Sequence, residues 1–288
     1  LEFHIADNPD RIDLKKRLVQ VYHLLDLRVP RALQDDVNRA YFEEERQIDH
    51  PTQLADFARD AAFRDMEPDF FEAFEAVRPC TMTTVERCYA LWDSVRYLHA
   101  RGLDGDLVEA GVWRGGSTML MARELVRAGA LDRMLWLYDT FDGLPHPDAE
   151  RDVDLLGNRA IEHWGPRRNG GDGSFWAYAS LDEVRENMRS TGYPEECLRF
   201  VAGRVEETIP ETMPERIALL RIDTDWYESY AHLMHHLYDR VVQGGIVILD
   251  DYGHFRGARQ AVDAFLAERG LAVPMLRIDY SARLIVKI

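Results

Sequence analysis

Short apolar runs alternate with segments of helical periodicity along the later part of the chain. Residues 217–222 and 246–249 are too short and too apolar for anything but buried strands. Between them, residues 228–242 carry Leu233, Leu237 and Val241 at helical spacing. A strand, a helix and a strand of this length form a βαβ crossover, so we expect two parallel strands in one sheet.

The same pattern predicts the remaining elements. Further strands are expected at residues 107–112, 135–141 and 199–203, followed by an antiparallel hairpin of residues 272–278 and 283–288. Helices are expected at residues 81–100, 117–128, 181–190 and 255–269. Their expected N-caps are Thr81 or Thr83 (with Glu86 completing a capping box), Ser117 and Ser180, while Thr224 or Asp225 would cap 228–242. This order predicts an α/β fold with a Rossmann-like, doubly wound sheet and a C-terminal antiparallel hairpin.

Residues 1–79 differ from the rest, because they are helical in pattern and highly charged. We expect a helical N-terminal extension followed by one domain at residues 80–288. Apolar stripes such as the one with Leu14 and Leu18 indicate core packing. An oligomer interface or one wall of a pocket is the alternative, and a homodimer or larger homo-oligomer is expected.

Charge and cysteine content exclude several classes of function. The chain of 288 residues has a formal net charge of −16, which disfavours nucleic acid and anionic membrane surfaces as partners. No apolar run approaches the length of a membrane span, and no signal peptide is expected. Cys80, Cys88 and Cys197 lack metal-ligand spacing, so reduced thiols and a cytoplasmic location are expected.

Three carboxylates follow the two strands of the crossover. Asp223 comes directly after one strand, and Asp250 and Asp251 come after the other. Open α/β sheets bind ligands at this carboxyl edge. Crowded carboxylates repel each other unless a cation offsets the charge, and Mg²⁺ prefers carboxylate oxygens. A metal site is therefore predicted, although acids at strand ends also serve as helix caps.

A glycine-rich turn at residues 109–117 joins a predicted strand to a helix. Its pattern is G-x-x-x-G-G, with Gly111 and Gly115 allowing close backbone approach to a ligand. Glu109 precedes the turn and would repel a pyrophosphate, whereas it would suit the cationic groups of S-adenosylmethionine. Asp139, at the end of the next strand, is placed to accept the ribose hydroxyls, with a turn or cap role as the alternative. Together these residues favour a methyltransferase.

Residues 142–180 form a long, Gly- and Trp-rich segment that we interpret as a lid. Trp164 and Trp176 make a lid a better interpretation than a disordered linker. His146 and His163 could touch a substrate, although isolated loop histidines are more often solvated.

Four motifs in this order resemble the TylF/MycF/NovP family of macrocin-type sugar O-methyltransferases. They lie at residues 107–117, 138–145, 221–229 and 244–253. The resemblance implies a class I methyltransferase sheet, S-adenosylmethionine, Mg²⁺, and a glycoside substrate methylated on a deoxysugar hydroxyl in antibiotic biosynthesis. The metal ligands implied are Asp223, Asp250 and Asp251. The cofactor-binding residues predicted from the turn and the resemblance are Thr81, Met82, Glu109, Gly111, Gly115, Ser117, Asp139 and Asp223, with Ser180 and Glu207 as weaker matches.

The general base is a choice between two residues. Asp223 is the first hypothesis, because a carboxylate beside the metal can take the hydroxyl proton. His254 is the second, although a surface histidine at a helix start is an equal interpretation. A catechol-type, metal-dependent O-methyltransferase of small molecules is the alternative function, disfavoured because no lysine follows Asp223 closely. The missing G-x-G-x-x-G motif disfavours an NAD-dependent dehydrogenase. The intact acids disfavour a non-catalytic scaffold.

Overall fold

A seven-stranded, mostly parallel sheet lies at the centre of the protein. The computed structural model describes residue 63, residues 65–164, residue 174 and residues 176–288. The strands are β1 (Asp106–Ala110), β2 (Leu135–Asp139), β3 (Leu198–Ala202), β4 (Ile217–Ile222), β5 (Val241–Leu249), β6 (Met275–Arg277) and β7 (Arg283–Val286). Their order in the sheet is β3-β2-β1-β4-β5-β7-β6, and β7 runs antiparallel to both of its neighbours. The predicted Rossmann-like sheet and its closing hairpin are confirmed.

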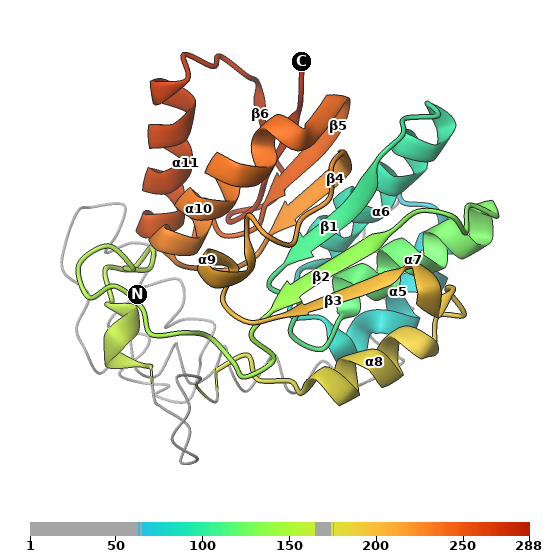
Figure 1. Ribbon diagram of the computed structural model, residues 1–288, viewed down its shortest axis with the longest axis horizontal. Helices are drawn as coiled ribbons and strands as arrows, with labels where there is room; N and C mark the ends of the chain where they lie inside the picture. The colour runs from blue at the N-terminus through green and yellow to red at the C-terminus, as the bar shows by residue number, and fades with distance from the viewer. Residues whose placement is uncertain (1–62, 64, 165–173, 175) are drawn as a thin grey trace, which may run out of the picture. The chain divides into compact units, whose positions relative to one another are not determined.

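Helices cover both faces of this sheet. They are α5 (Pro68–Val77), α6 (Val85–Ala100), α7 (Gly116–Ala128), α8 (Leu181–Arg189), α9 (Val205–Thr208), α10 (Tyr227–Leu237) and α11 (Arg256–Glu268). α5, α6 and α7 pack together on one face, and α10 packs against α11 on the other (Figure 1). None of the helices described is long and apolar enough to cross a membrane.

The core explains why β4 is apolar at every position except Arg221. All six of its residues are buried, because it lies between two parallel neighbours and beneath helices on both faces. Leu220 and Ile222 share one hydrophobic cluster with Leu233 and Leu237 of α10. The βαβ crossover predicted from these residues is confirmed, with β4 and β5 paired in parallel.

The predicted end of the crossover helix is wrong. α10 ends at Leu237, a 3₁₀ turn occupies Tyr238–Arg240, and β5 begins at Val241. Val241 pairs with Ile217 in the sheet, so a β-branched side chain that fits the helical spacing is used by the strand instead.

Three of the predicted helix caps are also wrong. Thr84 rather than Thr81 or Thr83 caps α6, since its side chain accepts from the Arg87 amide at 3.2 Å. α7 begins at Gly116 after a left-handed Gly115, which places Ser117 inside the helix. The N-cap of α10 is Trp226, without a side-chain cap of its own. A short hydroxyl or acid near a helix start predicts a cap only to within a few residues.

The boundary of the folded unit lies earlier than residue 80. A compact unit runs from Met66 to Ile288. α5 belongs to it because the Phe70 ring contacts the rings of Tyr89, edge to face, and Trp92, tilted, on α6, with ring centroids 5.1 and 5.6 Å apart. Most of the predicted N-terminal extension, residues 1–62 and 64, lies outside the described residues.

Candidate active site

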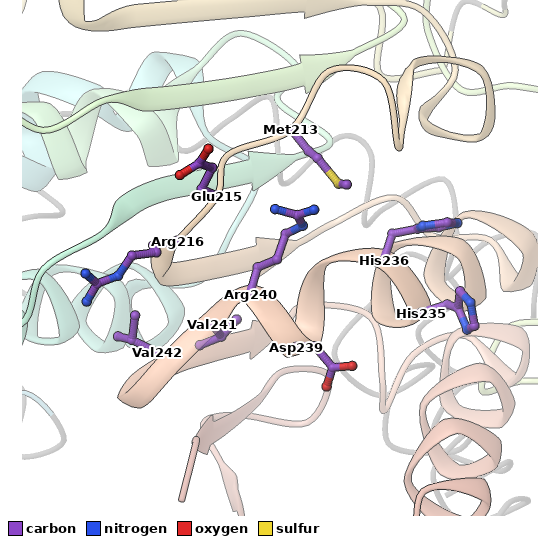
Figure 2. A pocket seen from close by; sticks show the side chains of 9 residues that line it. All are labelled: Met213, Glu215, Arg216, His235, His236, Asp239, Arg240, Val241 and Val242. Atoms are coloured by element: carbon purple, nitrogen blue, oxygen red, sulfur yellow. The ribbon is translucent and has the colours of Figure 1, made fainter.

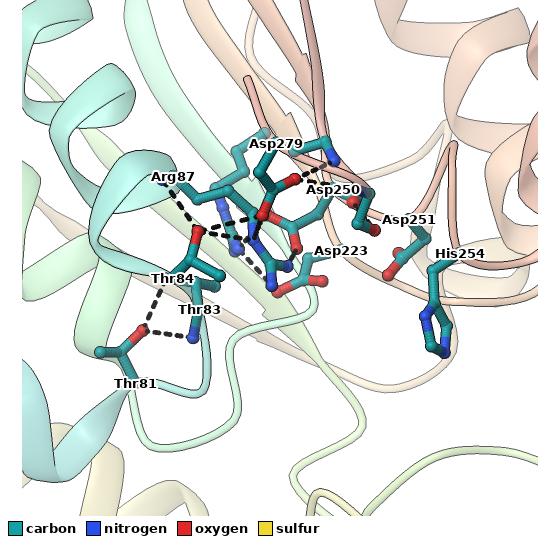
Figure 3. A network of polar contacts seen from close by, with 12 residues as sticks. Thr81, Thr83, Thr84, Arg87, Asp223, Asp250, Asp251, His254 and Asp279 are labelled. Carbon is teal, nitrogen blue, oxygen red and sulfur yellow. Dashed lines mark hydrogen bonds and ion pairs between the residues drawn. The ribbon is translucent and has the colours of Figure 1, made fainter. Parts of the chain in front are cut away.

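Three carboxylates converge where β4 and β5 end. Ile222 lies opposite Leu249 in the parallel pair, so Asp223 and Asp250 leave the sheet side by side, and Asp251 follows. One carboxylate oxygen from each of the three acids lies within 4.8 Å of the others. Figure 3 shows them facing a common space. The sequence prediction that these acids meet at the carboxyl edge is therefore correct in its geometry.

Arg221, on β4, lies beneath the carboxylates and is almost fully buried. Its Nη2 is 2.6 Å from Asp250 Oδ1 and 2.8 Å from Asp223 Oδ2. Its Nη1 is 2.5 Å from Glu109 Oε1. One guanidinium thus joins two of the three metal-ligand candidates, Asp223 and Asp250, to Glu109 at the start of the glycine turn. Each of these three acids gains an ionic partner.

The electrostatics of the cluster favour a bound cation. Burial raises the pKa of Asp223 well above its ordinary value, even though Arg221 opposes the shift. Burial and the neighbouring Asp250 raise the pKa of Asp251 to about 7. Burial would also raise the pKa of Asp250, but Arg221 and Arg87 outweigh it and lower this pKa. Burial is the first cause of both raised pKa values and the neighbouring carboxylates add to it, so a cation between these oxygens would favour their ionised forms.

The chemistry of the donor set fits a hard divalent cation. Asp223, Asp250 and Asp251 supply oxygen ligands from two strands, as Mg²⁺ requires. The buried hydroxyl of Thr224 has no hydrogen-bond partner among the described residues. Burying a polar atom without a hydrogen-bond partner costs free energy. Thr224 follows Asp223 directly in the chain, so this hydroxyl belongs to the same loop as the proposed ligand.

Asp225 is a member of the cluster that the sequence reasoning treated only as a helix cap. Its backbone is left-handed, with φ of 62°, a strained conformation typical of functional sites. Its amide donates to Asp251 Oδ2 at 3.1 Å, while no partner for its own carboxylate occurs among the described residues. Burial, and then Asp251 and Asp223, raise its pKa well above the ordinary value. The signal in the sequence that could have placed Asp225 in the cluster was its D-x-D spacing from Asp223.

His254 adjoins the cluster without joining it. Its Nδ1 is 3.5 Å from the Tyr280 hydroxyl, and its ring points away from the carboxylates (Figure 3). Burial lowers its pKa, so the imidazole is neutral near pH 7.

The glycine turn is held by Asp139 at the end of β2. Asp139 Oδ2 accepts from the amides of Val112 at 2.6 Å and Trp113 at 3.1 Å, and Oδ1 accepts from Phe141 at 2.7 Å. In this structure Asp139 therefore shapes the turn, and the role predicted for it toward ribose hydroxyls remains a prediction. Glu109 is similarly engaged, by Thr118 and by Arg221.

Gly111 brings the glycine turn against the loop after β4. Its φ is +83°, and an added Cβ would lie 1.8 Å from the carbonyl oxygen of Asp223. We expect Gly111→Ala to lower the free energy of unfolding by at least about 3 kcal/mol in urea denaturation. Gly129→Ala is the matched control, because its φ is +70° and no described atom lies within 4 Å of the added Cβ. It should cost about 1 kcal/mol, and equal costs for the two variants would contradict the close-approach argument.

The segment before α6 packs on the same turn. A Cβ on Gly116 would lie 2.4 Å from the Cys80 carbonyl oxygen. This contact places Thr81 beside the turn, and Met82 follows with 46% of its surface exposed. Both are therefore within the region where the sequence places the cofactor.

Two weaker cofactor predictions fall on the helices before and after β3. Ser180 caps α8, as predicted, accepting from the Glu183 amide at 3.3 Å. Glu207 is exposed on the short helix α9, which follows β3. Their predicted contacts with the cofactor stay predictions.

Part of the predicted lid is docked beside the carboxylates. Asp152 Oδ1 accepts from the Tyr227 amide at 2.8 Å and so caps α10 from the lid. The Arg256 amide, at the start of α11, donates to the Val153 carbonyl at 2.8 Å. Trp226 Nε1 donates to the Pro145 carbonyl at 2.9 Å. Residues 165–173 and 175 of the predicted lid lie outside the described residues.

Hollows occur at both edges of the sheet. One, of about 270 Å³, is lined by Pro145, His146, Pro147, Asp148, Asp152, Arg204, Glu206, Trp226 and Glu228. It lies on the lid side, and it contains His146 but not His163. The other, of about 520 Å³, includes Arg216 before β4 and Val241 at the start of β5. Figure 2 shows its lining. This hollow lies where β4 and β5 begin, whereas the carboxylates follow the ends of both strands, so we assign it no part in the chemistry.

Comparison with known proteins identifies the family of this chain. The family model of macrocin O-methyltransferase (TylF) matches residues 11–286. The mycinamicin III 3''-O-methyltransferase of Micromonospora griseorubida is 30% identical over 236 residues, covering 79% of this chain and 86% of that protein. A tetracenomycin-C 4'-O-methyltransferase of Streptomyces olivaceus that acts on a dimethoxy-rhamnosyl derivative is 34% identical over 199 residues, covering 69% and 72%.

A solved structure of an O-methyltransferase is also similar to this chain. The O-methyltransferase NovP superposes with a TM-score of 0.63 at 31% identity, covering 72% of this chain and 82% of that chain. The calicheamicin methyltransferase CalS11, with a TM-score of 0.53 at 16% identity, shares the fold. This protein is an O-methyltransferase, and it belongs to the TylF family of macrocin O-methyltransferases.

Proposed function

We propose that the protein transfers a methyl group from S-adenosylmethionine to a sugar hydroxyl of a glycosylated natural product, with Mg²⁺ bound by Asp223, Asp250 and Asp251. The convergence of these three acids within 4.8 Å, beside a glycine turn, is the observation that carries the proposal. The named relatives act on mycinamicin and on a rhamnosyl tetracenomycin, which supports a glycoside acceptor.

The cofactor would lie over the glycine turn, where Gly111 and Gly115 both take positive φ angles and Gly111 packs directly on the Asp223 carbonyl. Thr81 and Met82 would cover it, since the segment from Cys80 packs against the turn. S-adenosylmethionine supplies an electrophilic methyl group on a sulfonium. Glu109 would act on the cofactor indirectly, through Arg221 and Thr118, because both of these residues contact its carboxylate.

The carboxylates would prepare the acceptor hydroxyl. Bound Mg²⁺ supplies a Lewis acid that lowers the pKa of a coordinated hydroxyl. Asp223 remains a proposed proton acceptor, and the structure favours adding Asp225, whose carboxylate has no partner among the described residues and a raised pKa. Accepting the hydroxyl proton on an Asp225 oxygen would need no salt bridge to break, whereas Asp223 Oδ2 is paired with Arg221. His254 is the remaining candidate.

The acceptor would occupy the hollow beneath the lid. His146 and Trp226 line it, and Trp226 follows Asp225 directly in the chain. Most of the hollow's other lining residues are polar or charged, and such a lining beside one tryptophan ring suits the hydroxyls and the ring of a sugar. We also propose that the enzyme is a cytoplasmic homo-oligomer without nucleic acid or membrane partners.

The proposal is tested by methyl transfer from S-adenosylmethionine to rhamnosides of polyketides, with Mg²⁺ and with EDTA, against a catechol as the competing acceptor. We expect transfer to a rhamnoside that EDTA lowers by about 10²-fold or more, because the cation's charge stabilisation is worth several kcal/mol. Transfer to the catechol alone would support the catechol-type alternative. Full activity in EDTA would remove the metal from the proposal.

A further inference from the structure

Arg87 is a cation in an unfavourable place for a helix. It lies in the first turn of α6, where the helix dipole favours acids. Its side chain is only 12% exposed. Nη1 forms an ion pair with Asp250 Oδ2, and Nε lies 3.0 Å from Asp279 Oδ2. A residue that breaks a local preference this way is held by tertiary contacts, and such positions are expected at functional sites.

Asp279 comes from the turn between β6 and β7, and it binds Arg87 as part of a small network. Asp279 Oδ2 also accepts from the Thr84 hydroxyl at 3.0 Å, while Oδ1 accepts from the amides of Ser281 and Ala282 at 2.8 and 2.7 Å. The carboxylate is therefore fixed in place by its own turn. It gives Arg87 a second anchor that does not depend on Asp250.

Asp250 has a guanidinium on each oxygen. Arg221 Nη2 holds Oδ1 at 2.6 Å, and Arg87 Nη1 holds Oδ2. The two arginines differ in what else they hold. Arg221 also pairs with Glu109 and Asp223 beneath the sheet edge, so releasing Asp250 would disturb the core. Arg87 can release Oδ2 and still keep Asp279.

We propose that Arg87 is a positioning residue that occupies Asp250 Oδ2 in the cation-free protein and competes with the divalent cation for it. Asp279 restrains Arg87 when Oδ2 turns to the cation. The inference rests on the proposed function, since it takes Asp223, Asp250 and Asp251 as the cation site. It assigns to Arg87 and Asp279 the role of setting cation affinity, without contact with the methyl group or its acceptor.

The test is calorimetric titration of the full chain with Mg²⁺ alone, at fixed pH and ionic strength. Arg87→Gln keeps a donor amide but removes the charge, so we expect the Kd for Mg²⁺ to fall roughly tenfold or more. Arg87→Lys keeps the charge and should stay within about threefold of the wild type. Asp279→Asn leaves Arg87 with a weaker second anchor, so we expect roughly tenfold weaker Mg²⁺ binding. In the Arg87→Gln background the same substitution should have a much smaller effect.

The outcomes distinguish failure of the competition by Arg87 from failure of the proposed metal site. Mg²⁺ binding by the wild type with an unchanged or higher Kd in Arg87→Gln overturns the competition, while the metal site stands. Binding by neither protein overturns both the competition and the metal assignment. Circular dichroism checks that each variant folds. If Arg87→Gln does not fold, Asp279→Asn decides alone, because it keeps every arginine and an unchanged Kd would then overturn the proposal.

Discussion

Asp223→Asn is expected to lower kcat on the order of 10³-fold, because the substitution removes both a proposed cation ligand and a proposed proton acceptor. The side chain keeps its shape, and Arg221 keeps its pairs with Asp250 and Glu109. S-adenosylmethionine should therefore still bind within about threefold of the wild-type Kd. The measurements are steady-state methyl transfer and calorimetric titration with the cofactor and with Mg²⁺.

Asp239→Asn is the matched control for this change. Asp239 is a surface acid at the opposite edge of the sheet, 2.8 Å from Arg269, and its loss should leave kcat within about twofold, as for an exposed pair. Normal turnover by Asp223→Asn with unchanged Mg²⁺ affinity would sink the metal-and-base assignment. Loss of cofactor binding would instead mean that Asp223 belongs to the cofactor site.

Asp225→Asn is expected to lower kcat by about 10² to 10⁴-fold while the Kd for Mg²⁺ and the KM stay within about threefold. Asp225 lies beside the three proposed ligands, but its carboxylate has no partner among the described residues. Replacing this carboxylate with an amide should therefore remove the proton acceptor and change little else. The pH–rate profile supplies a second readout. An acid that must be ionised to accept a proton loses activity as pH falls through its pKa, and this limb should disappear in Asp225→Asn.

His254→Ala is the companion variant. Its ring points away from the carboxylates and lies 3.5 Å from Tyr280, so we expect kcat to stay within about threefold of the wild type. A large loss in His254→Ala, with normal turnover in Asp225→Asn, would return the role of base to His254. Normal turnover in both would leave Asp223 as the remaining proton acceptor.

Prediction from sequence was most accurate where the hydrophobic pattern left one solution. Residues 217–222 are apolar at every position except Arg221, and a strand buried on both faces was the only structure that such a short run could form. The boundaries of β4 agree with this prediction. The end of α10 was misjudged, because Val241 suits both helical spacing and a strand, and only its pairing with Ile217 decides between them.

The candidate site was predictable in its members but less so in its contacts. Parallel strands bring Asp223, Asp250 and Asp251 to one edge whatever surrounds them. The sequence could not reveal that Asp139 would be bound by three backbone amides of the turns beside it. It also gave no sign that Arg87, far away in the chain, would take an oxygen of Asp250.

The sequence by itself determined the sheet, the order of its elements and the edge at which the acids gather, because period and strand ends are local properties of the chain. Only the tertiary structure decided which charges are paired. Ion pairs such as Arg87 with Asp250 join residues far apart in sequence, and burial then sets the pKa of each acid. Partner and burial are properties of the packed molecule, so no local pattern encodes them.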